Sequence, residues 1–136
     1  IEYNCRMGDP ETEVVIPRLK NDLIDLFSAF KNGTLSKQKI EFDSRTASTV
    51  MLVSGGYPEA YEKGKLMSGL DLKTESILFH AGTKAQGAEV LTNGGRVLAI
   101  TSFGADISAA VNQSMDVANK INFEGKYFRR DIGFDL

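Results

Sequence analysis

Two short apolar runs on either side of Thr92-Asn93-Gly94-Gly95 constrain the fold of this chain most strongly. The runs cover residues 88–91 and 96–100, and both have the length of a strand. An Asn-Gly pair supplies the positive φ angles that a tight turn requires, so this pattern predicts an antiparallel hairpin. Residues 46–53 and 76–81 are rich in β-branched or apolar side chains and predict further strands.

Two helices are expected beside these strands. The first is predicted to begin near Ile16, or to be kinked at Pro17, and to end at Asn32-Gly33. Its apolar stripe has helical spacing and consists of Val15, Leu19, Leu23, Leu26, Phe27 and Phe30. The second helix is capped by Asp106, and its predicted stripe consists of Ile107, Val111, Met115, Ala118 and Ile121. Hairpins and helices without a strand–helix–strand rhythm favour an α+β fold with a mostly antiparallel sheet and two main helices.

Composition narrows the classes of partner. The chain has 136 residues, of which 42% are hydrophobic, enough for one domain with a core. The net charge is −2, with 16 basic and 18 acidic residues interspersed, so we expect neither nucleic acid nor an anionic membrane as partner. The apolar runs are too short to span a bilayer. Cys5 is the single cysteine, which fits a reducing compartment and leads us to expect a cytoplasmic protein.

The first residues carry the side chains that point most directly to chemistry. Residues 1–6 are predicted to be the end of a strand, which would place Glu2, Asn4 and Arg6 on one face. A carboxylate and an amide oxygen are ligands that magnesium accepts together with nucleotide phosphates. A guanidinium can hold a carboxylate or a phosphate with two hydrogen bonds. A tight turn is predicted at Gly8-Asp9-Pro10. Because such a strand stands at the first residue, we expect the chain to be the C-terminal part of a larger enzyme.

Five blocks of sequence resemble the glycinamide ribonucleotide synthetase (phosphoribosylamine–glycine ligase) family, in the order found in that family. The blocks are Glu2–Glu13 with Pro17-Arg18-Leu19, Ser54-Gly55-Gly56-Tyr57-Pro58, Phe79-His80-Ala81-Gly82-Thr83-Lys84, Thr92–Leu98 and Arg129-Arg130-Asp131-Ile132-Gly133. The chain departs from the family pattern at Met7, where an aromatic residue is usual, and at Glu13, where glutamine is usual.

The resemblance implies an ATP-grasp ligase that joins glycine to 5-phosphoribosylamine through a glycyl phosphate. ATP would be the co-substrate, with Mg²⁺ or Mn²⁺ as the metal. The products would be glycinamide ribonucleotide, ADP and phosphate, in purine biosynthesis. Residues 1–45 would be the end of the ATP-grasp domain, and residues 46–136 the C-terminal α+β domain. The implied site residues are Glu2 and Asn4 for the metal, Arg6 for catalysis, and Asp9, Glu11, Arg129 and Arg130 for substrate.

Other interpretations stay open at this point. A biotin-dependent carboxylase would share the E-x-N-x-R pattern, although Gly8–Thr12 argues for the ligase. A non-catalytic folded module is a third hypothesis, since the chain has no glycine-rich phosphate loop. Arg129-Arg130 would then be a solvated edge, and Asp9 and Glu11 would only shape a turn and a helix start.

Overall fold

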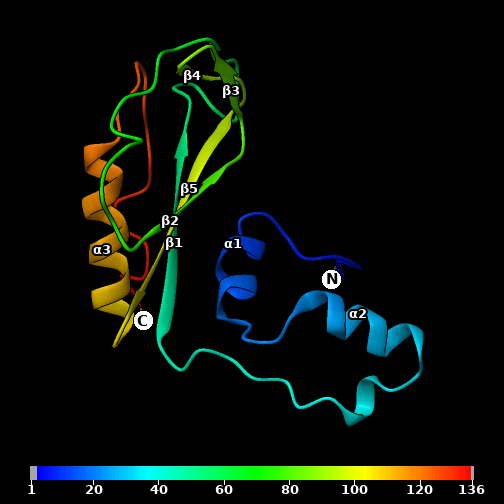
Figure 1. The fold of residues 1–136 in the computed structure, drawn as a ribbon. Coiled ribbons are helices and arrows are strands. Elements are labelled where there is room, and N and C mark those ends of the chain that lie inside the picture. The colour runs from blue at the N-terminus through cyan, green and yellow to red at the C-terminus, as the bar shows by residue number, and fades with distance from the viewer. Residues whose placement is uncertain (1–2, 136) are drawn as a thin grey trace.

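The computed structural model describes residues 3–135 and confirms an α+β fold with antiparallel sheets. The strands are β1 (Thr46–Val53), β2 (Ile77–His80), β3 (Thr83–Gln86), β4 (Glu89–Thr92) and β5 (Arg96–Gly104). The helices are α1 (Thr12–Val15), α2 (Leu23–Lys31) and α3 (Ile107–Lys120), with short 3₁₀ turns η1 (Ile16–Arg18) and η2 (Leu35–Lys37). The larger sheet has the order β1-β5-β2, and β3 pairs with β4 in a smaller one. α3 covers one face of the larger sheet, α1 lies on the opposite side, and α2 lies farther out (Figure 1).

Alternation along β1 creates two different faces. Ser48, Val50 and Leu52 are buried toward α3, where the hydrophobic core lies. Thr49 and Met51 are only partly buried and face the opposite side. Because strand side chains alternate, one strand supplies both the core and the floor of a surface site. The predicted strands at 46–53 and 76–81 are confirmed.

The hairpin predicted across Thr92–Gly95 is wrong. β4 pairs with β3, whereas β5 pairs with both β1 and β2. The turn instead carries the chain from the smaller sheet to the larger one, and Asn93 donates its backbone N–H to the Gly82 carbonyl at 2.7 Å. β5 is the central strand, and residues 97–102 are buried. A strand this apolar gains more by burial between two partners than it would at the edge of a hairpin.

The first predicted helix is interrupted. It starts earlier than expected, as α1 and η1, and the chain becomes extended at Leu19, which forms an isolated bridge with Phe42. Asp22 then caps α2 by accepting a backbone N–H from its first turn. Asn32-Gly33 ends α2 as predicted, with Gly33 at φ 65°. The apolar spacing is helical across the break, so the pattern alone does not reveal the bridge.

α3 begins as predicted, with Asp106 as its cap, but it packs through a neighbouring face. Its buried residues are Ala110, Ser114, Val117 and Ala118. The Ser114 hydroxyl lies 3.2 Å from that of Ser48 and 2.9 Å from that of Ser102. Small residues let the helix approach the sheet closely, and hydrogen bonds satisfy the buried hydroxyls. The predicted stripe therefore shares Ala118 with this face but misses Ala110, Ser114 and Val117.

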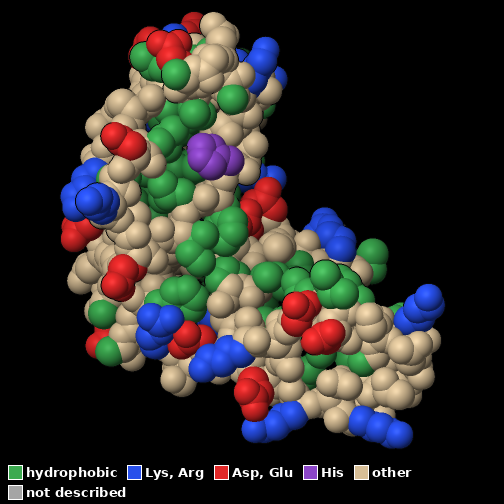
Figure 2. Space-filling view, viewed as in Figure 1, with side chains coloured by type: hydrophobic (Ala, Val, Ile, Leu, Met, Phe, Trp, Pro, Cys, Tyr) green, Lys and Arg blue, Asp and Glu red, His purple; other side chains and the backbone are tan. Residues whose placement is uncertain are grey.

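The α2 segment leaves apolar side chains exposed. Ile24, Phe27 and Phe30 are 73%, 67% and 74% exposed. Green hydrophobic side chains are visible over this part of the surface in Figure 2. No helix within residues 3–135 is long and apolar enough to cross a membrane.

Candidate functional site

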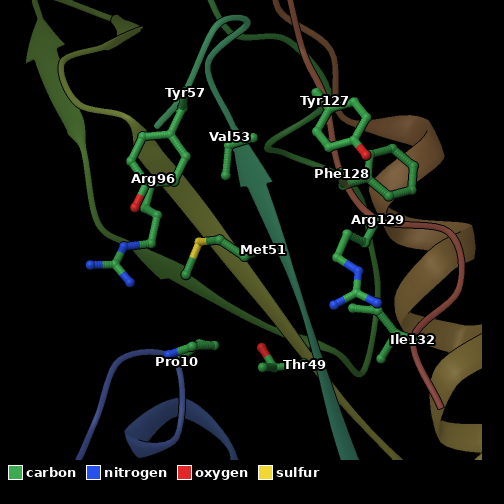
Figure 3. Close-up of a pocket in the computed structure, with 10 residues that line it drawn as sticks. All are labelled: Pro10, Thr49, Met51, Val53, Tyr57, Arg96, Tyr127, Phe128, Arg129 and Ile132. Atoms are coloured by element: carbon green, nitrogen blue, oxygen red, sulfur yellow. The ribbon is translucent and has the colours of Figure 1, made fainter. Parts of the chain in front are cut away.

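A cavity of about 410 Å³ opens on the face of the larger sheet that is opposite α3. Its floor comes from β1, and the segment after α3 forms one wall (Figure 3). The residues around it are Pro10, Thr49, Met51, Val53, Tyr57, Arg96, Tyr127, Phe128, Arg129 and Ile132. We call it the mixed cavity, since its lining is largely apolar with an arginine on each side. Figure 3 shows Arg96 and Arg129 on opposite sides of Met51.

Backbone pairing sets the position of the wall. Val53 and Tyr127 exchange two backbone hydrogen bonds, at 2.8 and 3.0 Å, so the last segment of the chain runs along the end of β1. Phe128 is buried and anchors this segment to the core, and Arg129 follows directly. The aromatic ring of Tyr57 reaches the cavity because residue 95 is glycine, where a Cβ atom would lie 2.1 Å from that ring.

The two adjacent arginines point to different places. Arg129 lines the mixed cavity and donates from Nε and Nη2 to the Asp131 carboxylate, both at 2.9 Å. These hydrogen bonds raise the pKa of Arg129 and lower the pKa of Asp131. The guanidinium of Arg130 lies 5.0 Å from the centre of the Phe128 ring and borders a different surface hollow. Of this predicted pair, therefore, the structure places only Arg129 at the mixed cavity.

A second, polar cavity of about 610 Å³ adjoins the first. It is lined by Asn4, Arg6, Met7, Gly8, Asp9, Glu11 and Arg96. It thus brings together four residues that sequence reasoning selected, namely Asn4, Arg6, Asp9 and Glu11. Glu2, the predicted partner of Asn4, lies outside the described residues.

The route by which these residues come together differs from the prediction. Residues 3–6 are not a strand in the structure. A strand is stabilised by pairing with a neighbour, and no strand of residues 3–135 pairs with this segment. The turn at Gly8-Asp9-Pro10 does form, and the Gly8 carbonyl accepts the backbone N–H of Thr12 at 3.1 Å. Glu11 closes the turn by accepting the backbone N–H of Gly8.

The lining of the polar cavity combines oxygen groups with two arginines, Arg6 and Arg96, and Arg96 pairs with the Asp9 carboxylate. Asn4 offers an amide oxygen, and Asp9 and Glu11 offer carboxylates, which are the groups that Mg²⁺ or Mn²⁺ bind. Within residues 3–135, no three His, Cys, Asp or Glu side chains are grouped closely enough to hold a metal ion by themselves. A metal beside Asn4 would therefore take further oxygens from Glu2 or from phosphate groups.

Arg96 is the site residue that sequence reasoning missed. It lines both cavities and contacts Asp9 twice. The sequence placed Arg96 at the start of a predicted strand and gave it no role in a site, because its contact with Asp9 joins residues that are far apart in the chain. A cation directly after two glycines, in a block that resembles a family pattern, was the signal available.

The chain matches the family model "Phosphoribosylglycinamide synthetase, C domain" over residues 47–135. It belongs to the phosphoribosylglycinamide synthetase family. It is 42% identical to the phosphoribosylamine–glycine ligase of Allochromatium vinosum over 135 residues, and 43% identical to that of Vibrio cholerae over 136 residues. Each alignment covers 98% of this chain and 32% of the relative.

A solved structure of this family shows the same fold. The crystal structure of phosphoribosylamine–glycine ligase from Thermotoga maritima aligns with a TM-score of 0.73 and 36% identity. The alignment covers 96% of this chain and 32% of that one. The chain therefore spans about a third of the length of the relatives that it matches.

Proposed function

We propose that this chain acts as the C-terminal part of an ATP-dependent ligase that joins glycine to 5-phosphoribosylamine. The proposal rests on one observation: in this member of the family, the polar cavity and the mixed cavity lie next to each other and share a lining residue. The polar cavity is lined by Asn4, Arg6, Asp9 and Glu11, and the mixed cavity beside it has Arg96 and Arg129 on its sides. The names of the relatives favour this ligase over a biotin-dependent carboxylase.

The proposed reaction has two steps. A carboxylate oxygen of glycine attacks the γ-phosphorus of ATP, ADP leaves, and glycyl phosphate forms. The amine nitrogen of 5-phosphoribosylamine then attacks the carbonyl carbon, phosphate leaves, and the nitrogen loses a proton to give glycinamide ribonucleotide. Positioning of the reactants and neutralisation of phosphate charge are the main means of catalysis for phosphoryl transfer.

The side chains of this chain divide these tasks. Arg6 is suited to hold an anionic oxygen of glycine or its phosphate, since its planar fork matches both groups. Asn4, with Glu2, would supply oxygens to Mg²⁺ or Mn²⁺, which when bound neutralises phosphate charge. Arg129 is the favoured partner for the ribose phosphate, because Arg130 borders another hollow.

The division of the chain is part of the same proposal. Residues 1–45 complete an ATP-grasp domain, and residues 46–136 form the C-terminal domain. The exposed apolar face of α2 supports this division, since a face of this kind is usually covered by other apolar surface. The remaining two-thirds of the ligase would supply that surface and the nucleotide-binding groups, and we place the enzyme in the cytoplasm.

An assay of the complete ligase chain tests the function. We expect formation of ADP that depends on both glycine and 5-phosphoribosylamine, with glycinamide ribonucleotide as product. Asn4→Ala should raise the magnesium concentration needed for half-maximal turnover, because it removes a metal-ligand oxygen. Asn119→Ala, on the exposed side of α3, is the matched control and should leave that concentration unchanged. ADP formation that does not require glycine would overturn the proposed reaction.

A further inference from the structure

Arg96 stands at the border between the two cavities. Among the described residues, it is the one side chain that lines both. The chain crosses the same border at Asp9-Pro10, where Asp9 lines the polar cavity and Pro10 lines the mixed cavity. A change in the position of the Arg96 side chain would therefore alter the shape of both cavities.

The backbone of Arg96 is fixed by the larger sheet. It lies opposite Val53 in the pairing of β1 with β5, and its carbonyl accepts the backbone N–H of Gly82 at 2.8 Å. The side chain thus projects from a backbone position that pairs on both sides. In contrast, residues 3–8 belong to no helix or strand, so their position depends more on side-chain contacts.

The guanidinium of Arg96 holds the Asp9 turn at two points. Nη1 donates to the Asp9 backbone carbonyl at 3.2 Å, and Nε lies 3.4 Å from the Asp9 carboxylate. The two side chains are 41% and 48% exposed, and an ion pair this exposed contributes little to folding stability. A guanidinium has five N–H donors, so others stay available for an anion in either cavity.

We propose that Arg96 is a positioning residue that ties the Asp9 turn to the rigid sheet and so aligns the polar cavity with the mixed cavity. The inference rests on the proposed function, since the two cavities would hold the two reactants that must meet. Asp9 then acts through Arg96 rather than by contact with substrate. A misalignment of two reacting groups by about 1 Å can cost on the order of a hundred-fold in rate.

A double-mutant cycle in the complete ligase tests this proposal. The variants are Arg96→Gln, Asp9→Asn and the double variant, and kcat is measured with all substrates saturating. We expect Arg96→Gln to lose about ten-fold in kcat, because it removes both contacts with the Asp9 turn. Asp9→Asn should show a smaller but measurable loss, because it leaves the contact with the Asp9 backbone carbonyl. The double variant should lose no more than Arg96→Gln alone, since Asp9→Asn then has no remaining contact with Arg96 to remove. Arg96→Lys keeps the positive charge but lacks the planar guanidinium with its several N–H donors. It should replace Arg96→Gln in the cycle if Arg96→Gln does not fold.

Arg45→Gln is the matched control. It removes another Arg–Asp ion pair, between Arg45 and the half-buried Asp43, and neither residue lines either cavity. It should leave kcat unchanged. A double variant whose loss is the product of the two single losses would overturn the proposal, as would a normal kcat in either single variant. The proposed function fails separately, if the unmodified ligase forms no ADP with glycine and 5-phosphoribosylamine.

Discussion

At the scale of single residues, the arginines at 129 and 130 show that neighbours in sequence need not share a site. Arg129 lines the mixed cavity beside Met51, while Arg130 stacks on Phe128. In the complete ligase, Arg129→Ala should raise the Michaelis constant for 5-phosphoribosylamine. A charge-assisted hydrogen bond is worth about 1.5–3 kcal/mol, which corresponds to roughly a ten- to hundred-fold loss of affinity.

Arg130→Ala is the matched control for this prediction. It should change that Michaelis constant little, because the side chain borders a different hollow. The constants for glycine and ATP should stay nearly unchanged in both variants. Equal losses for all three substrates in Arg129→Ala would indicate a general disturbance of the enzyme. A loss confined to Arg130→Ala would contradict the assignment from the structure.

At the scale of secondary-structure elements, the contact between α3 and the sheet depends on small side chains. Ser114 is fully buried and bonds with the hydroxyls of Ser48 and Ser102. Ser114→Ala should lower the free energy of unfolding by about 1–3 kcal/mol, because buried hydroxyls lose a partner. Urea unfolding of the 136-residue chain measures this change. Ser108→Ala, exposed on the same helix, should cost much less, and equal costs would contradict the role of the buried hydroxyls.

The elements also show which kinds of structure the sequence reveals. β1 begins and ends where its β-branched run begins and ends, and Asp106 caps α3 as its side-chain chemistry predicts. These features depend on neighbours in the chain. The partner of β5 depends instead on burial between β1 and β2, which the local Asn93-Gly94 signal cannot specify. The break after η1 depends on the bridge from Leu19 to residue 42, which is likewise a long-range contact.

The same distinction applies to the candidate site. Asn4 and Arg6 were identified from an expected strand and from their chemistry, and Asp9 and Glu11 from the family resemblance. The structure places all four around one cavity. Arg96 was missed because its importance comes from its contact with Asp9 across the fold. Asn4 and Arg6 were grouped because a strand was predicted for residues 1–6. They do line one cavity, but residues 3–6 are not a strand.

At the scale of the whole molecule, the face of α2 is exposed in this chain, whereas we expect it to be covered in the complete ligase. Phe27 is 67% exposed here, but we propose that the rest of an ATP-grasp domain covers it. Phe27→Glu should therefore destabilise the complete ligase much more than the 136-residue chain. Burial of an aromatic side chain contributes about 1.5–3 kcal/mol, and a buried unpaired carboxylate costs more.

Unfolding of both proteins by urea measures the difference. Ser36→Glu introduces the same carboxylate at an exposed polar position beyond α2 and should have a small effect in both chains. Comparing the unfolding free energies of the two variants separates the effect of a charge within a covered apolar surface from the effect of the charge alone. If Phe27→Glu changed the unfolding free energy equally in the complete ligase and in the 136-residue chain, the face of α2 would be open in both. Residues 1–45 would then not complete a larger domain through that face.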